Sequence, residues 1–357
     1  MKKVAIWAPL RYANYGDDLQ AIIMAKYIKS LGYQVKLFQL EASLAKQYNM
    51  ESVATVDALC MDINLCIIAG GGLLTPYSFP KRILQKTVRE YEQDFKDLFI
   101  AAKKYDVKFC AISIGGDGKE RIPCKYYSQH RIKFFRSSYF INGTVRLFGD
   151  VQQMKKFEKD FIYYPDMLFR ISDYCEYDKL EMVSKYRIGI NFKKGRHLDY
   201  KLLDSIYEYA ENHNDIEFHF TTTHMQKIGL NYQYIPEYEY KNIKIDKYES
   251  PKQLLGVLAS MDVFITSMLH LGLTGLALGT PFISYRGPGK AKSFLKSIGG
   301  HWAIVDDHIS FKELKEQFFC KNRIDLYNQY DTTIIAKMVD ESLKHYQFCK
   351  LILEKHS

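Results

Sequence analysis

Residues 3–40 read KVAIWAPLRYANYGDDLQAIIMAKYIKSLGYQVKLFQL, and this stretch predicts a β-α-β unit. An apolar strand at 3–8 leads through a loop at 10–16 into a helix, whose apolar residues recur at helical spacing. Asp17 is the expected N-cap of this helix, and Gly32 is its expected left-handed C-cap. A second strand at 33–40 completes the unit, which is the building block of a parallel sheet.

The same alternation continues along the chain in two series. The first series has strands at 64–69, 107–114, 139–141 and 161–164, with helices at 81–105 and 123–137. After a polar stretch at 172–184, the second has strands at 186–192, 216–221, 262–266 and 281–285, with helices at 199–213, after Ser250-Pro251 and at 268–278. This pattern predicts an α/β protein with two Rossmann-like domains facing each other across a cleft, an arrangement called GT-B-like. The expected domains are 1–175 and 176–327, followed at 328–357 by a helix that crosses back to the first domain.

Composition narrows the class of protein. The 357 residues are 47% hydrophobic and 25% charged, which is typical of globular domains, and the length favours two of them. A net charge of +9 favours anionic partners, but the basic residues are scattered, so nucleic-acid binding is not expected. Two small basic clusters stand out, Lys193-Lys194-Gly195-Arg196 and Arg286 with Lys290 and Lys292, although solvated surface is their simplest interpretation.

Seven cysteines without regular spacing argue against a disulfide framework and against a zinc site. Cys66 and Cys110 lie in apolar strands, where cysteine acts as a small hydrophobic residue. The apolar start of the chain is interrupted by Pro9 and Arg11, so it resembles a strand more than a signal peptide. No apolar stretch approaches the ~20 residues of a membrane span. We therefore expect a cytoplasmic protein without metal or cofactor.

Candidate site residues follow the predicted strands, where open α/β sheets place their ligands. The loop Asn14-Tyr15-Gly16-Asp17 precedes a helix N-terminus, which suits an anion or a hydroxyl group. Gly70-Gly71-Gly72 follows a buried strand and permits close approach of a ligand to the backbone. Ile114-Gly115-Gly116-Asp117 is a similar glycine-containing turn after the next predicted strand. None of these is a Walker A loop or a G-x-G-x-x-G fingerprint, which argues against ATPase and NAD-binding functions.

Two further segments complete the set. Val145-Arg146 and Pro165-Asp166 each follow a short strand, and Arg146 is either an anion ligand or a surface residue. The segment 266–281 joins a strand to a helix that has His270 in its first turn. The helix dipole disfavours an imidazolium there, but a bound dianion reverses this preference. His270 is therefore the candidate proton donor.

This ordered set of motifs resembles the polysaccharide pyruvyl transferase family. The matching segments are Asn14-Tyr15-Gly16-Asp17, Gly70-Gly71-Gly72, Val145-Arg146, Pro165-Asp166, Met268-Leu269-His270, Gly279-Thr280-Pro281, and Tyr285 ahead of Lys290. The resemblance implies transfer of the pyruvyl group of phosphoenolpyruvate onto a sugar of a bacterial surface polysaccharide or its precursor, such as an exopolysaccharide unit, as a ketal with release of phosphate.

The resemblance also assigns roles to residues. His270 is the implied proton donor to the vinyl carbon of phosphoenolpyruvate. The implied donor-binding residues are Arg146 in the first domain and, in the second domain, Lys194, Arg196, Ser267, Met268, Leu269, Arg286 and Lys290. The implied acceptor-binding residues are Asn14, Gly16, Asp17, Gly70, Gly71, Gly72 and Asp166. The acceptor is a sugar or a lipid-linked oligosaccharide, and the positive charge is compatible with peripheral association at an anionic membrane.

Met268 departs from the family pattern, which has arginine before Leu269-His270. Loss of such a charge-assisted contact costs about 1.5–3 kcal/mol. The Val145-Arg146-Leu147 segment also lacks the acidic residue usual at its third position. Either Arg286, Lys194 or Arg196 substitutes for the missing charge, or the donor differs, or catalysis is lost.

Two alternatives remain open at this point. A GT-B glycosyltransferase that uses a nucleotide sugar shares the cleft and the glycine-rich loops, with Asp306 and Asp307 as candidate ribose ligands. The second alternative is a non-catalytic anion-binding relative, which Met268 suggests because it replaces the arginine of the family pattern.

Overall fold

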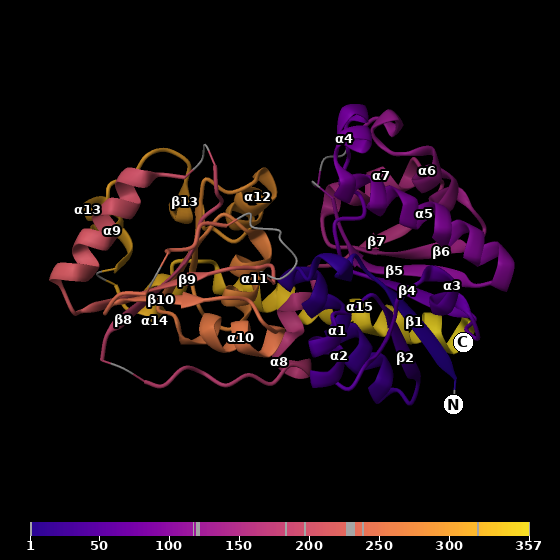
Figure 1. Ribbon diagram of the computed structural model, residues 1–357, viewed down its shortest axis with the longest axis horizontal. Helices are drawn as coiled ribbons and strands as arrows, with labels where there is room; N and C mark the ends of the chain where they lie inside the picture. Colours follow the sequence, from indigo (N-terminus) through magenta and orange to yellow (C-terminus); the bar gives the residue numbers. More distant parts are fainter. Residues whose placement is uncertain are drawn as a thin grey trace. The chain divides into compact units, whose positions relative to one another are not determined.

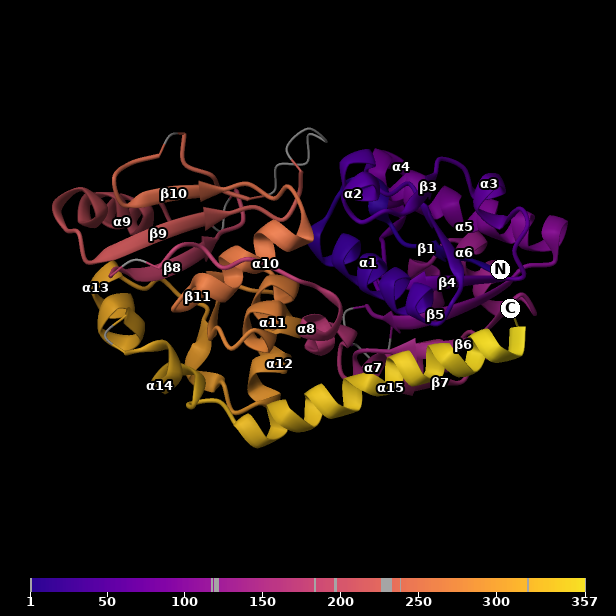
Figure 2. The same ribbon diagram turned by 90° about the horizontal axis from the view of Figure 1, so that it is seen from below.

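The computed structural model describes residues 2–116, 118, 122–182, 184–195, 198–225, 233–237, 239–319 and 321–356 (Figures 1 and 2). The chain forms two compact units. The first comprises Met1–Ala13, Asp17–Arg170 and Asp340–Ser357, and the second comprises Asn14–Gly16 and Ile171–Val339. Each unit is built on its own parallel sheet with alternating helices, so the predicted α/β fold with two Rossmann-like sheets is confirmed.

The first unit has a seven-stranded sheet in the order β3-β2-β1-β4-β5-β6-β7. Its strands are β1 (Lys3–Trp7), β2 (Gln34–Phe38), β3 (Glu51–Val53), β4 (Leu65–Ala69), β5 (Lys108–Ile114), β6 (Phe140–Val145) and β7 (Phe161–Tyr163). All neighbouring strands are parallel, and β1 lies between β2 and β4. Strand β4 is buried along its whole length, because helices cover both faces of the sheet.

The helices of the first unit are α1 (Tyr15–Ser30), α2 (Ala42–Gln47), α3 (Val56–Cys60), α4 (Phe79–Leu84), α5 (Lys86–Tyr105), α6 (Gln129–Arg136) and α7 (Phe148–Lys155), together with the end of α15 (Thr332–His356). Helices α3, α5 and α6 pack their apolar faces on one side of the sheet and form its main core (Figure 1). Helices α1 and α15 meet on the other side, where the Tyr27 and Tyr346 rings are edge to face at 5.1 Å. No described helix combines the length and the apolarity that a membrane span requires.

A buried arginine fixes the loop after β4. The Arg131 side chain is fully buried and ion-paired with Glu92. It donates hydrogen bonds to the carbonyl oxygens of Leu73 and Thr75, at 3.0 and 2.9 Å. A buried charge is costly unless its donors find acceptors, so these hydrogen bonds must be kept. The arginine therefore fixes the position of residues 73–75, which directly follow the glycine loop 70–72.

The second unit has a six-stranded parallel sheet in the order β10-β9-β8-β11-β12-β13. Its strands are β8 (Tyr186–Asn191), β9 (Ile216–Thr221), β10 (Ile243–Asp246), β11 (Val263–Thr266), β12 (Phe282–Tyr285) and β13 (Ile304–Val305). Its helices are α8 (Ile171–Tyr174), α9 (Tyr200–Asn212), α10 (Pro251–Ser260), α11 (Leu269–Ala277), α12 (Gly289–Ser297), α13 (Phe311–Leu314) and α14 (Arg323–Tyr327), with the start of α15. Helix α9 packs on one face of this sheet, and α11 packs against β12 through Gly272 and Phe282.

Some local predictions need correction. Asp17 is not the N-cap of α1, because the helix already begins at Tyr15. The Asn14 side chain accepts the amide hydrogen of Gly16 at 3.0 Å and takes the capping role instead. The single helix expected at 81–105 is two helices, α4 and α5. Gly32, with φ +88°, is in the left-handed conformation expected of it, and Ser250 caps α10 as predicted.

A charged cluster lies in the second sheet on β8, β9 and β10. His219 is buried between the carboxylates of Asp246 and Glu217, with N–O distances of 2.8 and 3.0 Å, and Arg187 lies 3.2 Å from Glu217. Burial lowers the pKa of His219, but hydrogen bonds to Asp246 and Glu217 outweigh burial and leave it raised. The hydrogen bond from His219 does most to lower the pKa of Glu217 from 4.5 to about 2, against the effect of burial.

The contribution of this cluster to the free energy of unfolding should therefore be greatest between about pH 4.5 and 6.5. The contribution of Glu217 is complete above pH 4.5 and is lost as pH falls toward about 2. The contribution of His219 is complete below pH 6.5 and is lost as pH rises through its raised pKa. Urea unfolding across pH measures this, and His219→Gln should flatten the alkaline loss, whereas His130→Gln on the exposed surface of α6 should not. An unchanged alkaline slope in His219→Gln would rule out this explanation.

Candidate functional site

Each sheet has one point at which its strand order reverses, between β1 and β4 in the first unit and between β8 and β11 in the second. Open α/β sheets bind ligands at the carboxyl ends of the strands beside such a point. In the second sheet, β8 ends at Asn191, β11 ends at Thr266 and α11 begins at Leu269. The loop that carries Ser267 and Met268 therefore occupies the position where this fold binds its ligands.

Side-chain hydrogen bonds hold this loop in place. The Thr266 hydroxyl accepts the amide hydrogen of Met268 at 2.9 Å and donates to Asn191 Oδ1 at 3.3 Å. The Ser267 hydroxyl donates to the carbonyl oxygen of Tyr285 at 2.9 Å. Met268 stands at the N-cap position of α11 without a side-chain capping bond. The first amides of a helix have no acceptor within the helix, and the helix dipole adds positive potential there, so this turn suits an anion.

His270 lies in the first turn of α11 and is half-buried. Its carbonyl oxygen accepts a hydrogen bond from Thr274 Oγ1 at 2.7 Å, and the Tyr15 hydroxyl donates to that same Oγ1 at 3.0 Å. The imidazole packs against the backbone of Gly16, where an added Cβ atom would stand 2.0 Å from His270 Nδ1. Only glycine leaves room for the ring in this orientation.

The segment Asn14–Gly16 belongs to the second unit, although the helix that it opens continues in the first. The amide of Tyr15 donates to the carbonyl oxygen of Thr223 at 2.7 Å, and Asn14 forms an antiparallel bridge with His224. The structure thus brings together Asn14, Gly16 and His270, three of the residues that the sequence singles out. Asp17, the next residue, is assigned to the first unit.

His224 is a candidate site residue that the sequence analysis missed. Because Asn14 Oδ1 accepts from Gly16, the Asn14 amide group donates to His224 Nε2 at 2.9 Å. The proton of the neutral ring then lies on Nδ1, 3.1 Å from Thr223 Oγ1. Burial lowers the pKa of His224 to about 4, so this histidine is neutral near pH 7 and orients Asn14 rather than supplying a proton. The polar run 221–224 directly after a buried strand was the available signal.

Arg286 lies at the carboxyl end of β12, in a left-handed backbone conformation with φ +48°. Its guanidinium is 3.4 Å from Asp199 and lies over the Tyr285 ring at 5.2 Å. The same carboxylate accepts hydrogen bonds from Tyr285 and His308, at 3.2 and 2.6 Å. Burial alone would raise the pKa of Asp199, but these hydrogen bonds lower it below its usual range. These contacts hold the Arg286 cation in position. Arg286 directly follows Tyr285, whose carbonyl oxygen accepts the hydrogen bond from Ser267.

The remaining predicted donor ligands are less closely grouped. Lys290 is half-exposed in the first turn of α12. Lys194 is exposed and lines a pocket with residues of α9 and with Tyr234, Ile235, Glu237 and Tyr240. Arg196 lies outside the described residues. Lys292 is ion-paired with Asp306 at 2.6 Å. Across the described part of the chain, no three histidine, cysteine, aspartate or glutamate side chains come together as metal ligands would.

The first unit has its own cluster, at the carboxyl ends of β4 and β6. Gly70 and Gly71 adopt left-handed conformations, with φ +62° and +78°. The side chain of Gln20 accepts the amide hydrogen of Gly71 at 3.1 Å and donates to Asp166 at 3.2 Å. A Cβ atom at Gly70 would stand 2.1 Å from Gln20 Oε1, so glycine is required for this contact.

Arg146 joins the same cluster. Its guanidinium is 3.3 Å from the Asp166 carboxylate and 3.4 Å from the carbonyl oxygen of Gly71. Both side chains of the ion pair are about 95% buried. The structure therefore brings together Gly71, Arg146 and Asp166, and it excludes the interpretation of Arg146 as an ordinary surface arginine.

Comparison with solved structures defines the type of fold. The chain is similar to Anabaena HepE (Alr3699) in complex with UDP and glucose, with TM-score 0.56 and 10% identity over 99% of this chain and 100% of that one. It is similar to the UDP-GlcNAc 2-epimerase of Neisseria meningitidis, with TM-score 0.56 and 8% identity over 100% of both chains. It is also similar to the glycosyltransferase SnogD of Streptomyces nogalater, with TM-score 0.52 and 11% identity over 98% of this chain and 99% of that one. The fold is thus of the GT-B type.

The sequence also matches a family. Residues 151–286 match the model of the polysaccharide pyruvyl transferase family, which confirms the predicted resemblance over that stretch. The prediction that the chain is an enzyme, a transferase, is confirmed with it. The match contains Asp166, His270 and Arg286, whereas Asn14, the glycine loop 70–72 and Arg146 lie outside it. A comparison with curated protein sequences found no match.

Proposed function

We propose that this transferase moves the pyruvyl group of phosphoenolpyruvate onto two hydroxyl groups of a sugar and releases phosphate. The observation that supports this most directly is the position of His270. It stands in the first turn of α11, beside the reversal point of the second sheet and within the stretch that matches the family. An acid at an anion-binding helix end is what protonation of a phosphorylated enol requires.

One histidine, His270, is enough to supply and recover the proton that the proposed reaction needs. His270 donates its proton to the CH₂ carbon of phosphoenolpyruvate, which becomes a methyl group and leaves positive charge on the adjacent carbon. One sugar hydroxyl forms a C–O bond to that carbon. A second hydroxyl forms another as the C–O bond to phosphate breaks, giving a ketal. Of the two hydroxyl protons, one returns to His270 and the other leaves on phosphate.

We assign the donor to the second unit. The amides in the first turn of α11 and the Ser267 hydroxyl would hold one anionic group, with Leu269 against the vinyl carbon. Arg286 stands next to Tyr285, whose carbonyl oxygen accepts from Ser267, so it is our candidate for the charge that Met268 does not supply. Its ion pair with Asp199, at 3.4 Å, fixes its position. Lys290 and Lys194 are the further basic residues of this assignment.

We assign the acceptor to the first unit, through the glycine loop 70–72, Asp17 and the buried pair of Arg146 and Asp166. In this assignment Arg146 acts by fixing Gly71 and Asp166 rather than by direct contact with the donor. We further propose that the acceptor is a precursor of a surface polysaccharide, free or lipid-linked. A cytoplasmic location is part of this proposal, and the six described cysteines are all free thiols, in keeping with it.

The test is direct. Incubation with phosphoenolpyruvate and a panel of galactose- and mannose-type acceptors should release phosphate only when an acceptor is present. Mass spectrometry should find the ketal on the sugar. Failure to release phosphate over the whole panel, by a protein that remains folded, would count against pyruvyl transfer.

Transfer from a nucleotide sugar is the second candidate. The similarity to HepE, whose solved structure contains UDP and glucose, is the observation that favours it. Thermal-shift measurements separate the two candidates, because a bound ligand raises the melting temperature. Stabilisation by phosphoenolpyruvate and not by UDP-sugars supports pyruvyl transfer, and the reverse result supports glycosyl transfer.

A further inference from the structure

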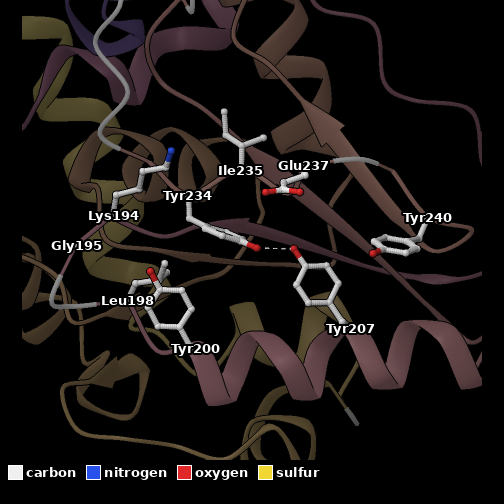
Figure 3. A pocket seen from close by; sticks show the side chains of 9 residues that line it. All are labelled: Lys194, Gly195, Leu198, Tyr200, Tyr207, Tyr234, Ile235, Glu237 and Tyr240. Atoms are coloured by element: carbon white, nitrogen blue, oxygen red, sulfur yellow. Dashed lines mark hydrogen bonds between the residues drawn. The ribbon is translucent and has the colours of Figure 1, made fainter.

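Four of the nine residues that line a pocket in the second unit are tyrosines (Figure 3). It encloses about 630 Å³, which is within the usual range for small-molecule sites of about 300–1,000 Å³. Its lining residues are Lys194, Gly195, Leu198, Tyr200, Tyr207, Tyr234, Ile235, Glu237 and Tyr240. We call this the tyrosine pocket; none of these residues except Lys194 has a place in the reaction proposed above.

Two of the tyrosines come from one helix. Tyr200 and Tyr207 are seven residues apart on α9, which is about two helical turns, so both project on the same side. Tyr234 stands opposite them, and its hydroxyl is 2.6 Å from that of Tyr207 (Figure 3). Tyr240 lies at one end of the pocket and Lys194 at the other.

Much of this aromatic surface is exposed. Tyr200 is 64% exposed and Tyr240 is 42% exposed. Large exposed aromatic surfaces are costly in water, and several of them around one hollow indicate a surface that a ligand covers. The Tyr207 ring packs against Tyr240 at 5.8 Å and the Tyr234 ring against Phe220 at 5.9 Å, so these three rings offer the ligand a preformed wall.

The charges at the pocket decide the chemical class of the ligand. Lys194 and Glu237 both line it, so one cation and one anion stand at its walls. A cationic ligand of the kind that aromatic cages bind would be opposed by Lys194, and an anionic ligand by Glu237. A neutral ligand that has an apolar face and many hydroxyl groups avoids both penalties. Its hydroxyls can bond to the ammonium, the carboxylate and the phenolic groups.

We propose that the tyrosine pocket binds a neutral pyranose unit of a glycan, with the sugar face stacked on the tyrosine rings. Apart from Lys194, the residues of this site have no role in the proposed reaction at His270, and sugar binding here needs no donor. For a transferase that acts on a polysaccharide or its precursor, it would hold a sugar other than the one that is modified.

Binding of neutral disaccharides in the absence of phosphoenolpyruvate tests the proposal. Saturation-transfer NMR and titration calorimetry with galactose- and mannose-containing disaccharides should detect binding to the wild-type protein. Tyr200→Ala should weaken it by about tenfold, the effect of losing one stacked ring. Tyr126→Ala is the matched control, since Tyr126 is 38% exposed in the first unit and should leave the affinity unchanged.

Glu237→Gln is a second variant, at an exposed position. It should weaken sugar binding, because a charged acceptor is replaced by a neutral amide. Circular dichroism confirms that each variant is folded. The proposal is overturned if no disaccharide binds at millimolar concentrations, if Tyr126→Ala weakens binding as much as Tyr200→Ala, or if tetramethylammonium binds in place of sugar. Because no donor is present, these outcomes do not depend on whether pyruvyl transfer occurs.

Discussion

Replacement of His270 by alanine should lower the turnover number of pyruvyl transfer by about 10²- to 10⁴-fold, the usual contribution of a general acid. A proton donor acts in the transition state and not in ground-state binding, so the KM for phosphoenolpyruvate should change little. The measurement is phosphate release at saturating donor and acceptor, with the melting temperature recorded for each variant.

Two controls sharpen this experiment. His301→Ala removes an exposed histidine of the same unit and should leave turnover unchanged. Added imidazole should restore part of the rate of His270→Ala, because it can enter the space of the missing ring and supply the proton. Turnover of His270→Ala within a few-fold of the wild type would place the proton donor elsewhere or leave the reaction without one.

Much of the fold was predictable from local sequence, because apolar strands alternate with amphipathic helices. The strand at 216–221 was predicted to the residue, and most others to within one or two at each end. Three strands were missed, β3, β10 and β13, which have three, four and two residues. Such short strands contain too few residues to show a periodic pattern, and their pairing depends on neighbours that are distant in the chain.

The candidate site was predictable only in its parts. The turn around His270 could be recognised because a buried strand runs into a helix through polar residues. The contact between Gly16 and His270, and the hydrogen bond between Asn14 and His224, join residues more than 200 positions apart. Nothing in local sequence indicates such pairs: the polar run 221–224 marks a loop after a strand, but not the contact of His224 with Asn14.

Arg146 shows a related limit. Its sequence context is equally typical of an exposed arginine and of a ligand-binding one. The structure adds Asp166, which follows the next strand and pairs with it under near-complete burial. Burial of a charge requires a partner of opposite charge, and the identity of that partner depends on which strands lie side by side.

Gly16→Ala should lower turnover by about 10²-fold, because a displacement of roughly 1 Å of a catalytic group can have this effect. The added methyl group would lie 2.0 Å from His270 Nδ1, so the imidazole must move away. Alanine has a higher helix propensity than glycine by about 0.8–1.0 kcal/mol, and Gly16 lies in the first turn of α1. Local helix energetics therefore favour the substitution, and only the contact with His270 opposes it.

Gly275→Ala provides the matched control, on the same helix as His270. A Cβ atom there meets Thr280 at an ordinary contact distance of 3.5 Å, so turnover should stay close to that of the wild type. The expected signature of Gly16→Ala is a low rate in a protein whose melting temperature is nearly unchanged, and the double variant with His270→Ala should be no slower than His270→Ala alone. A double variant with the same rate as His270→Ala would mean that the two substitutions remove the same function. Normal turnover of Gly16→Ala would show that the ring does not need its position against this loop, and the assignment of His270 as proton donor would then lose its geometric basis.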